Sequence, residues 1–464
     1  MTLITENGDA PSRRRVVMIA AAFPPTGGPG VQRVAKFAKF LPQFGWQPYV
    51  WAVDRMSEFP TDESLLDDLP ECVVVHRRRV GGVAHAVQAA FKRRAKYDNG
   101  ARLSHGVTWR LQRWIESRSS PDPYGAWARS GLGPLTRLSA RWGIAAVFSS
   151  FSPASNHWLA MHLVKRTGLP WIADFRDLWT DDYRYTEPQA RRRRAHWRLE
   201  QRILQEADRV IGVTPAQTAM LADRVSDQRR KFVTIRNGFD PADFANTAAW
   251  PSGDGKRFVL GYVGRLERRR VSEAFLVGFT NLAAYLGDAR RRFVFRVVGH
   301  VGSSTRQRLA STGIPCEFLD YVPHARAIAE MRSATVLLVV VPAGANSDTT
   351  IPAKPYEYLA SGRPILHIGP AGGQCAELVH ACAAGVSVPW DSGRICHALV
   401  DYFNQWRRGG VLAGCPPLRL AAFNREHLTG RLADLLDAVA PHARPPLRDI
   451  DRVDRSVARV GARG

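Results

Sequence analysis

The sequence predicts an α/β protein made of two doubly wound, parallel-sheet domains that face each other across a cleft. Short runs of apolar and β-branched residues alternate with longer stretches of helical periodicity along most of the 464 residues. The first run, Val16–Phe23, is apolar throughout, which is typical of a strand buried on both faces of a parallel sheet. The alternation is interrupted at 246–257, where small and turn-forming residues indicate a linker.

The first domain is expected to span residues 1–245. Its predicted strands are Val16–Phe23, Tyr49–Asp54, Cys72–His76, Ile144–Ser150, Trp171–Asp177, Arg209–Thr214 and Phe232–Arg236. The second domain is expected over residues 258–415, with strands at Phe258–Gly264, Phe293–Gly299, Cys316–Val322, Thr335–Val341, Arg363–Gly369 and Gly385–Pro389. Because ligands of open parallel sheets bind beyond the carboxyl ends of the strands, the crevice between the domains is the predicted ligand site.

Residues 416–440 are predicted to close the fold as helices that pack back toward the first domain. An amphipathic pattern over Phe423–Val439 supports such a helix. The tail at 441–464 is rich in Pro and Arg, has no sustained periodicity, and is expected to be a disordered basic segment.

The charge balance indicates the kind of partner. Sixty-five Lys and Arg against 42 Asp and Glu give a formal net charge of +23, which attracts the phosphates of nucleotides, lipid headgroups or nucleic acid. An arginine-rich composition without functional meaning is the alternative. Residues 1–15 lack the apolar core of a secretory leader, and the longest apolar run, Ala334–Ala343, is too short to span a bilayer, so we expect a cytoplasmic protein.

No cofactor and no metal are predicted. The six cysteines are scattered and form no C-x-x-C pair, so they are interpreted as reduced structural thiols. Cys375, His380 and Cys382 could hold a metal in principle, but their spacing matches no standard zinc pattern.

A glycine-rich turn follows the first predicted strand. The segment FPPTGGPGVQR places Gly28 and Gly30 directly before a helix expected to start near Val31. Glycine lets the backbone approach a phosphate, and a helix N-terminus offers unpaired N–H groups and the positive end of a dipole. The pattern is neither G-x-G-x-x-G nor a P-loop, which argues against dinucleotide redox chemistry and ATP hydrolysis. A plain tight turn is the alternative.

Arginines follow the first strand of the second domain. In LGYVGRLERRRV, Arg265 comes directly after the strand and Arg270 closes a run of three arginines. Planar guanidinium groups hold phosphate oxygens in bidentate fashion and neutralise charge on a departing diphosphate. A solvated basic helix face is the alternative.

The most specific segment is SDTTIPAKPYEYLASGRPILHIG, at 347–369. Glu357 is predicted on a short helix that ends at Gly362, and a buried strand follows Pro364. An ionised carboxylate can accept hydrogen bonds from two adjacent ribose hydroxyls. A surface helix residue is the alternative for Glu357 taken alone.

Four sets of residues resemble the retaining, GT-B-fold glycosyltransferases of family 4, over nearly the whole chain to about Val439. The opening strand and loop are matched by FPPTGGPGVQRVAKFAKFLPQFGWQPYV, and the acceptor-domain core of one bacterial branch by VFSSFSPASNHWLAMHLVKRTGLPWIADFRDLWTDD. The domain-closing region is similar in LEQRILQEADRVIGVTPAQT and TIRNGFD, and the donor-domain signature in GYVGRLERRR and KPYEYLASGRPIL.

The resemblance implies two Rossmann-like domains, a nucleotide-diphosphate-sugar donor in the second domain, an acceptor in the first, and transfer with retention without a bound metal. Arg265 and Arg270 would bind the diphosphate, and Arg270 stands where the family more often has Lys. Glu357 matches the second acid of the family's E-x7-E motif, whereas Thr349 occupies the place of the first. The implied donor-binding set also includes Gly28, Gly30, Thr350, Ile351 and Lys354.

Residues after two strands of the first domain complete the candidate site. Many family members carry a His after the strand that here is Ile144–Ser150, and the nearest one in this chain is His157, further into the helix. The predicted catalytic set is Arg265, Arg270, His157 and Asp177, and the predicted acceptor-side set is Ser150, Ser152, Asp174 and Arg176. A buried core histidine and a structural Asp–Arg pair are the respective alternatives. For the reaction, we expect same-face attack, in which the departing phosphate oxygen takes the acceptor proton.

The expected acceptor is a sugar or lipid-linked alcohol of cell-surface polysaccharide, glycolipid or natural-product biosynthesis. Residues 76–119 mix basic and aromatic residues and can lie on an anionic membrane surface, with a solvated helix as the alternative. A nucleotide-sugar epimerase of the same fold is an alternative function. A basic nucleic-acid-binding protein is another, although no nucleic-acid motif is found and no nucleic acid is expected.

Overall fold

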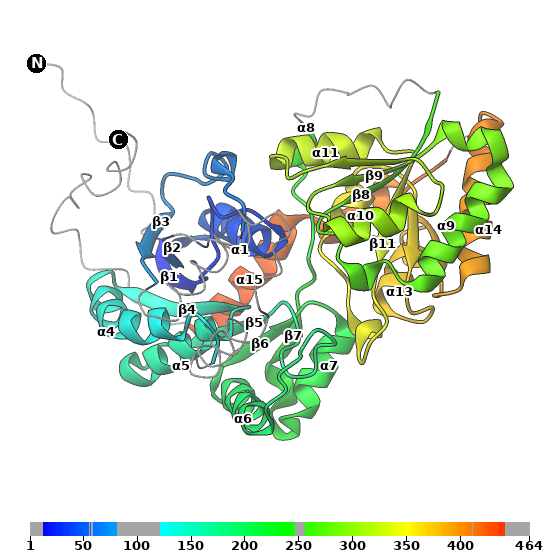
Figure 1. Ribbon diagram of the computed structural model, residues 1–464. Coiled ribbons are helices and arrows are strands. Elements are labelled where there is room, and N and C mark those ends of the chain that lie inside the picture. The colour runs from blue at the N-terminus through cyan, green and yellow to red at the C-terminus, as the bar shows by residue number, and fades with distance from the viewer. Residues whose placement is uncertain are drawn as a thin grey trace, which may run out of the picture.

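The strands of the protein fall into two separate parallel sheets, each covered by helices (Figure 1). The computed structural model describes residues 13–54, 56, 59–80, 121–245, 256–410 and 412–440. The strands predicted before the linker lie in one sheet, and the strands predicted after it lie in the other. This agrees with the predicted two-domain α/β fold. The predicted linker is largely, and the C-terminal tail wholly, outside the described residues.

The first sheet has seven strands in the order β3-β2-β1-β4-β5-β6-β7, and every pair is parallel. Its strands are β1 Arg14–Ile19, β2 Trp46–Val53, β3 Val74–Arg78, β4 Ile144–Phe151, β5 Trp171–Phe175, β6 Arg209–Gly212 and β7 Phe232–Thr234. The strand order reverses between β1 and β4. In sheets of this kind the reversal point is where ligands bind.

The second sheet has six strands in the order β10-β9-β8-β11-β12-β13 and is also parallel. Its strands are β8 Phe258–Val263, β9 Phe293–Val298, β10 Cys316–Leu319, β11 Val336–Val340, β12 Ile365–Ile368 and β13 Gly385–Val388. Every residue of β8 and β11 is buried, as expected for central strands covered on both faces. The order reverses between β8 and β11.

The helices of the first domain are α1 Pro29–Phe40, α4 Gly125–Arg141, α5 Ala154–Thr167, α6 Ala190–Glu206 and α7 Pro215–Asp223. Those that follow are α8 Ala242–Ala245, α9 Glu273–Leu286, α10 Ser303–Ala310, α11 His324–Ser333, α12 Lys354–Ala360, α13 Gln374–Ala381, α14 Ser392–Arg407 and α15 Arg425–Val439. Side chains cap several of them: Thr214 accepts from Gln217 N and Ser272 from Phe275 N. Among the described residues, no helix has the length and apolar character needed to cross a membrane.

The predicted strands are found with shifted ends. β5 ends at Phe175, two residues before the predicted end at Asp177, and β7 ends at Thr234. Arg176, just beyond β5, donates through its guanidinium to the carbonyls of Gly30 and Ser152. The residues at these strand ends are therefore loop residues, which is the part of the fold that carries ligand contacts.

The last helix, α15, packs on the first domain although it follows the second in sequence. Leu428, Leu432 and Leu436 lie in one apolar cluster with Val31 and Phe37 of α1. Asp437 accepts a hydrogen bond from Trp46 Nε1 at 2.8 Å. Figure 1 shows α15, in red, crossing beside α1. The chain therefore passes between the domains twice.

One buried ion pair connects the strands at the reversal point of the first sheet. Arg33 of α1 and Asp174 of β5 are 2% and 0% exposed, and Nη2 of Arg33 lies 2.7 Å from Oδ1 of Asp174. Arg33 also donates to the carbonyl of Ile235 at 3.0 Å, and Ser150 donates to Oδ2 of Asp174 at 2.7 Å. The pair thus joins α1, β4, β5 and the segment after β7.

Replacing Asp174 by Ala is expected to destabilise the fold by about 3–5 kcal/mol, because Arg33 would remain buried without its counter-ion. Urea unfolding measures this. As a control, Asp320→Ala removes the exposed Arg306–Asp320 pair and should cost about 0–1 kcal/mol. A similar small loss for both variants would contradict the role given to the buried pair.

Candidate functional site

Most of the predicted site residues come from the carboxyl ends of β1 and β4 in the first sheet and of β8 and β11 in the second, whereas Asp174, Arg176 and Asp177 lie at the end of β5 and His157 lies within α5. Gly28 and Gly30 follow β1, and Ser150 and Ser152 lie at the end of β4 or just after it. Arg265 and Arg270 follow β8, and the segment after β11 carries Thr350, Ile351, Lys354 and Glu357. The topology therefore brings the predicted residues of the first domain to one edge of the first sheet. It brings those of the second domain to one edge of the second sheet.

Glu357 lies in the first turn of α12 with a cation beside it. Its Oε2 is 2.7 Å from Nζ of Lys354, and the two side chains are 13% and 25% exposed. Burial would raise the pKa of Glu357, but the charges of Lys354 and His324 outweigh this effect and hold the pKa below its usual value. Glu357 is therefore an ionised acceptor at neutral pH.

The two arginines after β8 have different surroundings. Arg265 is exposed, and its side chain has no hydrogen bond or ion pair within the described residues. Arg270 donates through Nη1 to the carbonyl of Val340, the last residue of β11. Its Nε is buried and finds no acceptor among the residues that the structure describes. The guanidinium of Arg270 is thus held on the neighbouring strand with its Nε–H unused. The guanidinium of Arg265 is free to turn toward a ligand.

The helix of Glu357 is joined directly to the strand that precedes Arg265. The hydroxyl of Tyr358, one residue after Glu357, accepts a hydrogen bond from the backbone N of Val263 at 2.8 Å. Tyr358 is buried, so this bond fixes α12 against the end of β8. The acid and the two arginines therefore belong to one edge of the second domain, which is the arrangement that a diphosphate and a ribose would require.

Thr350 and Ile351 line the approach to α12. Ile351 is 4% exposed and belongs to the apolar cluster of the second domain, whereas Thr350 is half-buried. Thr349, where the resemblance would expect an acid, donates through Oγ1 to the carbonyl of Asn346 at 2.7 Å. Its own carbonyl accepts from Thr214 of the first domain at 2.8 Å. Thr349 is thus part of a contact between the domains.

The loop that carries Asp177 reaches the second domain. Asp177 accepts from Nη2 of Arg184 at 2.6 Å. The ring of Tyr183 lies 5.8 Å from Cζ of Arg269, and a Cβ on Gly344 would lie 2.8 Å from Cβ of Tyr183. Tyr183 was missed from the sequence, although an aromatic residue in a polar loop after a strand could have indicated it. The loop of the first domain therefore touches both loops that flank the donor-side residues.

Arg176 fixes three loops of the first domain. Its guanidinium donates to the carbonyls of Gly30 and, at 3.0 Å, Ser152. A Cβ on Gly30 would lie 2.7 Å from Nη2 of Arg176, so a larger residue there would displace this guanidinium. Gly28 has a φ of 106°, which also favours glycine. Gly28, Gly30, Ser152 and Arg176 therefore form one group at the reversal point of the first sheet.

Asp174 and Ser150, predicted on the acceptor side, are occupied within the protein. Both are almost completely buried, and the Asp174 carboxylate is shared between Arg33 and Ser150. Asp174 therefore forms a structural Asp–Arg pair, here with Arg33, and Ser150 is bonded to the same carboxylate. Both side chains brace the loops around them, and neither is accessible to a substrate in this structure.

His157 lies in the core of the first domain. It is 0% exposed, its Nδ1 is 2.7 Å from Oγ of Ser149, and its ring centroid is 4.6 Å from that of Phe175. Burial lowers its pKa to about 3, and the charge of Asp174 opposes this only in part. A neutral, enclosed imidazole is not placed to take a proton from a substrate, so His157 corresponds to the core-histidine alternative.

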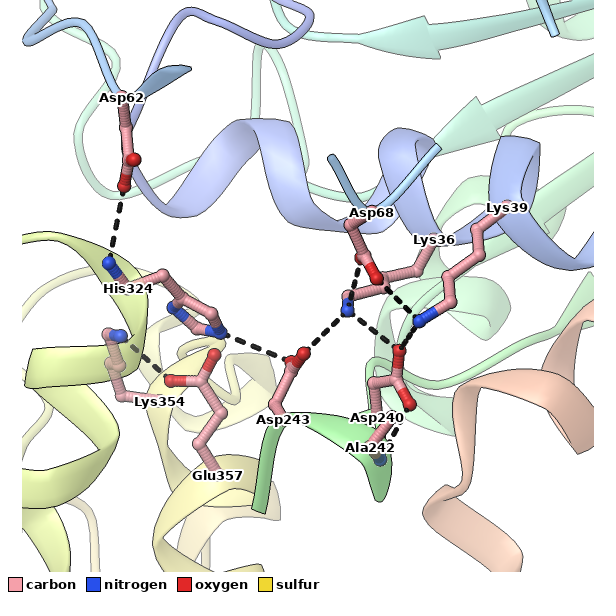
Figure 2. A network of polar contacts seen from close by, with 10 residues as sticks. All are labelled: Lys36, Lys39, Asp62, Asp68, Asp240, Ala242, Asp243, His324, Lys354 and Glu357. Atoms are coloured by element: carbon pink, nitrogen blue, oxygen red, sulfur yellow. Dashed lines mark hydrogen bonds and ion pairs between the residues drawn. The ribbon is translucent and has the colours of Figure 1, made fainter. Parts of the chain in front are cut away.

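A network of charged side chains, which the sequence did not indicate, connects the two domains (Figure 2). Asp62 of the first domain accepts from the backbone N of His324 at 3.2 Å, at the start of α11 in the second. Nε2 of His324 is 3.1 Å from Oδ2 of Asp243. In Figure 2 the carboxylate of Glu357 lies near the ring of His324, and the charge of His324 acts to lower the pKa of Glu357.

Three carboxylates of this network have the spacing of a metal site but are filled by ammonium groups. Side-chain oxygens of Asp68, Asp240 and Asp243 lie within 4.8 Å of one another. Nζ of Lys36 is 2.6, 2.7 and 2.8 Å from Asp68, Asp240 and Asp243, and Lys39 contacts Asp68 and Asp240 as well. Burial would lower the pKa of Lys36, but the three carboxylates raise it above its ordinary value. This cluster is therefore an ion-pair network, and we assign no metal to it.

A second buried arginine lies near the candidate site. Arg425, the first residue of α15, is 3% exposed, and its Nη1 has no acceptor within the described part of the chain. Burial and the charge of Arg33 lower its pKa to about 10, while the charge of Glu357 acts in the opposite direction. Sequence reasoning missed Arg425 because a single Arg at a helix start gives no signal of burial.

Comparison with known protein families gives a match in the first domain. Residues 27–243 match the profile of Glycosyltransferase Family 4, a range that lies within the first domain. No curated protein sequence matches the chain.

Solved structures share the whole architecture. Sucrose-phosphate synthase from Thermosynechococcus elongatus has a TM-score of 0.64 at 17% identity, covering 92% of this chain and 99% of that one. HepE from Anabaena in complex with UDP-glucose has a TM-score of 0.61 at 12% identity, covering 91% and 99%. Trehalose 6-phosphate synthase from Burkholderia multivorans has a TM-score of 0.60 at 15% identity, covering 93% and 100%. The protein therefore has the GT-B fold.

Replacing Lys354 by Met is expected to raise the pKa of Glu357. Burial raises this pKa, and the variant lacks the positive charge of Lys354 that opposes the effect. In the wild type, the folded pKa lies below the unfolded value, so this pair contributes stability above about pH 4.5, which is lost as the pH falls through the folded pKa. The free energy of unfolding of the variant should thus be lower than that of the wild type at neutral pH. The two values should converge as the pH falls into the acid range. A carbon-detected NMR titration of Glu357 and urea unfolding at several pH values measure both effects.

The control is Lys165→Met, which removes the more exposed Lys165–Glu206 pair. It should leave the titration of Glu357 unchanged. An unshifted Glu357 in the Lys354 variant would refute the pairing described here.

Proposed function

We propose that this protein is a retaining glycosyltransferase that moves a sugar from a nucleotide-diphosphate-sugar to an acceptor hydroxyl. One observation carries the proposal: Arg265, Arg270 and Glu357 share one edge of the second domain, and the loop of Asp177 and Tyr183 from the first domain contacts that edge. The GT-B fold and the family 4 match of residues 27–243 support a transferase. HepE, which has the same fold, was solved with UDP-glucose, so a UDP-sugar is the first donor to test.

In the proposed complex, the donor lies against the second domain. Arg265 and Arg270 hold the diphosphate, and the unused Nε–H of Arg270 supplies a donor that is already oriented. The ribose hydroxyls donate to Glu357, which leaves Lys354 free to contact the donor phosphates. The backbone around Gly28 and Gly30 and the segment with Thr350 and Ile351 close around the donor from either domain.

The proposed reaction breaks the bond between the anomeric carbon and the diphosphate oxygen and forms a bond to the acceptor oxygen on the same face. The acceptor proton passes to the departing phosphate oxygen. Arg265 and Arg270 stabilise the charge that develops there, and Asp177, held by Arg184, orients the acceptor from the first domain. His157 is left out of this mechanism because it is enclosed. The acceptor is proposed to be a sugar or a lipid-linked alcohol used in polysaccharide, glycolipid or natural-product biosynthesis.

Replacing Arg265 or Arg270 by Ala is expected to lower turnover by about 10²–10³, by analogy with the loss of one donor to a developing anion. Glu357→Ala should chiefly weaken donor binding. A panel of nucleotide sugars in a thermal-shift assay, followed by donor-consumption kinetics with candidate acceptors, measures both effects. Arg291→Ala is a matched control, since Arg291 is exposed in the 3-10 helix Gly287–Arg292, outside the proposed site.

Stabilisation by a nucleotide sugar that is equal in the wild type, Arg265→Ala and Glu357→Ala would refute the proposed donor site. NMR of the product establishes whether the anomeric configuration is retained, and a trapped sugar–protein adduct would rule out same-face attack. Conversion of the donor sugar without any acceptor would instead indicate an epimerase.

A further inference from the structure

Helix α6 presents a continuous row of arginines on the surface of the first domain. Arg191, Arg194 and Arg198 are exposed, and Arg202 follows with a side chain that is 57% exposed. These positions are three or four residues apart, so the side chains project from the same side of the helix. We call Arg191, Arg194, Arg198 and Arg202, together with Trp197, the α6 basic face.

Trp197 lies within this charged surface and is 49% exposed. It comes three residues after Arg194 and next to Arg198, so its indole borders the row of guanidinium groups. The opposite side of the helix is buried through His196, Glu200, Ile203 and Leu204. The helix is therefore attached to the domain by its other side, and the indole is available to a partner.

Three of the four arginines of the α6 basic face have no counter-ion in the part of the chain that the structure describes. Within the described residues, the side chains of Arg191, Arg194 and Arg198 have no hydrogen bond or ion pair. Of the two acids in α6, Glu200 is buried and bonded to Arg224 at 2.7 Å. The other, Glu206, lies 3.6 Å from Arg202 at the end of the helix.

The loop on the proposed acceptor side packs along α6. Tyr185 OH is 2.8 Å from Nδ1 of His196, and the backbone N of Thr180 donates to Oε2 of Glu200 at 3.2 Å. Asp177 and Tyr183 belong to this same loop. A surface that contacts α6 would therefore be connected, through one loop, to the residues proposed to orient the acceptor.

We propose that the α6 basic face docks the protein on an anionic lipid surface. A straight row of cations suits a plane of anionic headgroups, and an indole beside it suits the boundary between headgroups and acyl chains, where Trp is enriched. The net charge of +23 adds long-range attraction. Docking there would place the acceptor-side loop next to the membrane. Residues 76–119 were predicted to lie on an anionic membrane surface, and 81–119 of them lie outside the described residues.

Flotation of the full-length protein with vesicles tests this proposal. Vesicles that contain phosphatidylglycerol should carry the protein at low salt, and phosphatidylcholine vesicles should not. Binding should fall as salt shortens the range of the attraction, to about 8 Å at physiological ionic strength. Vesicle binding needs no sugar donor, so its result is independent of the proposed function.

Trp197→Ala and the double variant Arg194→Gln, Arg198→Gln should each lower the partition coefficient, the double variant on the order of 10-fold or more. Glutamine keeps the helix propensity of arginine. The matched control is Arg407→Gln, Arg408→Gln, which removes the same charge from exposed positions at the end of α14 and should change binding by less than about twofold. Unchanged melting temperatures would show that all variants fold.

Three outcomes would overturn the proposal. The α6 variants could bind phosphatidylglycerol vesicles as tightly as the wild type. The α14 control could lose as much binding as the α6 double variant, which would attribute binding to net charge alone. Duplex DNA could bind wild-type protein and displace it from the vesicles at equal phosphate concentration, with DNA binding lost in the α6 variants, which would assign this face to nucleic acid.

Discussion

The buried pair of Arg33 and Asp174 holds the first domain together at the point where the order of its strands reverses. Arg33 donates to Asp174 of β5 and to carbonyls at Ile235 and Arg236, so one guanidinium joins α1 to two strand ends. A buried charge is tolerated only when it is paired and hydrogen-bonded, and this pair meets both conditions. The glycine-rich loop before α1 and the loop after β5 are therefore fixed in position relative to one another.

Contacts between the domains depend on this fixed edge. Asp62 reaches the start of α11, Tyr183 reaches the loops around Arg269 and Gly344, and Thr214 bonds the backbone at Thr349. All three belong to loops at the carboxyl edge of the first sheet. Polar and aromatic contacts of this kind can be broken and remade more readily than an apolar interface, which suits a site that must admit a donor and release a nucleotide.

Electrostatics separates two kinds of cation in this arginine-rich chain. Lys36 and Arg33 are buried and fully paired, and they stabilise the fold. Arg265 and three arginines of α6, Arg191, Arg194 and Arg198, have no partner among the described residues, so their charge is available to ligands. Arg270 lies between these cases, because its backbone contact fixes its direction while Nε remains unused. Arg265, Arg270 and the arginines of the α6 basic face are therefore the cations on which the proposals of donor and membrane binding depend.

The two-domain parallel α/β fold, the order of the strands along the chain and the helix that carries Glu357 could all be predicted from the amino-acid sequence. These are consequences of local periodicity, glycine and proline positions, and runs such as Val336–Val340 that are apolar on both faces. The same reasoning also gave Arg265, Arg270 and Glu357, since each lies within a few residues of a strand end or a helix start. The family resemblance added their proposed roles.

Which polar residues are available to a ligand depends on how the elements pack in three dimensions. Asp174, Ser150 and His157 have the chemistry of site residues, yet burial and partners from distant segments occupy or enclose them. His324 and Arg425 gave no signal in the sequence, because the charged groups around them come from segments far apart along the chain. Burial and pairing depend on packing between elements, which local sequence pattern does not encode.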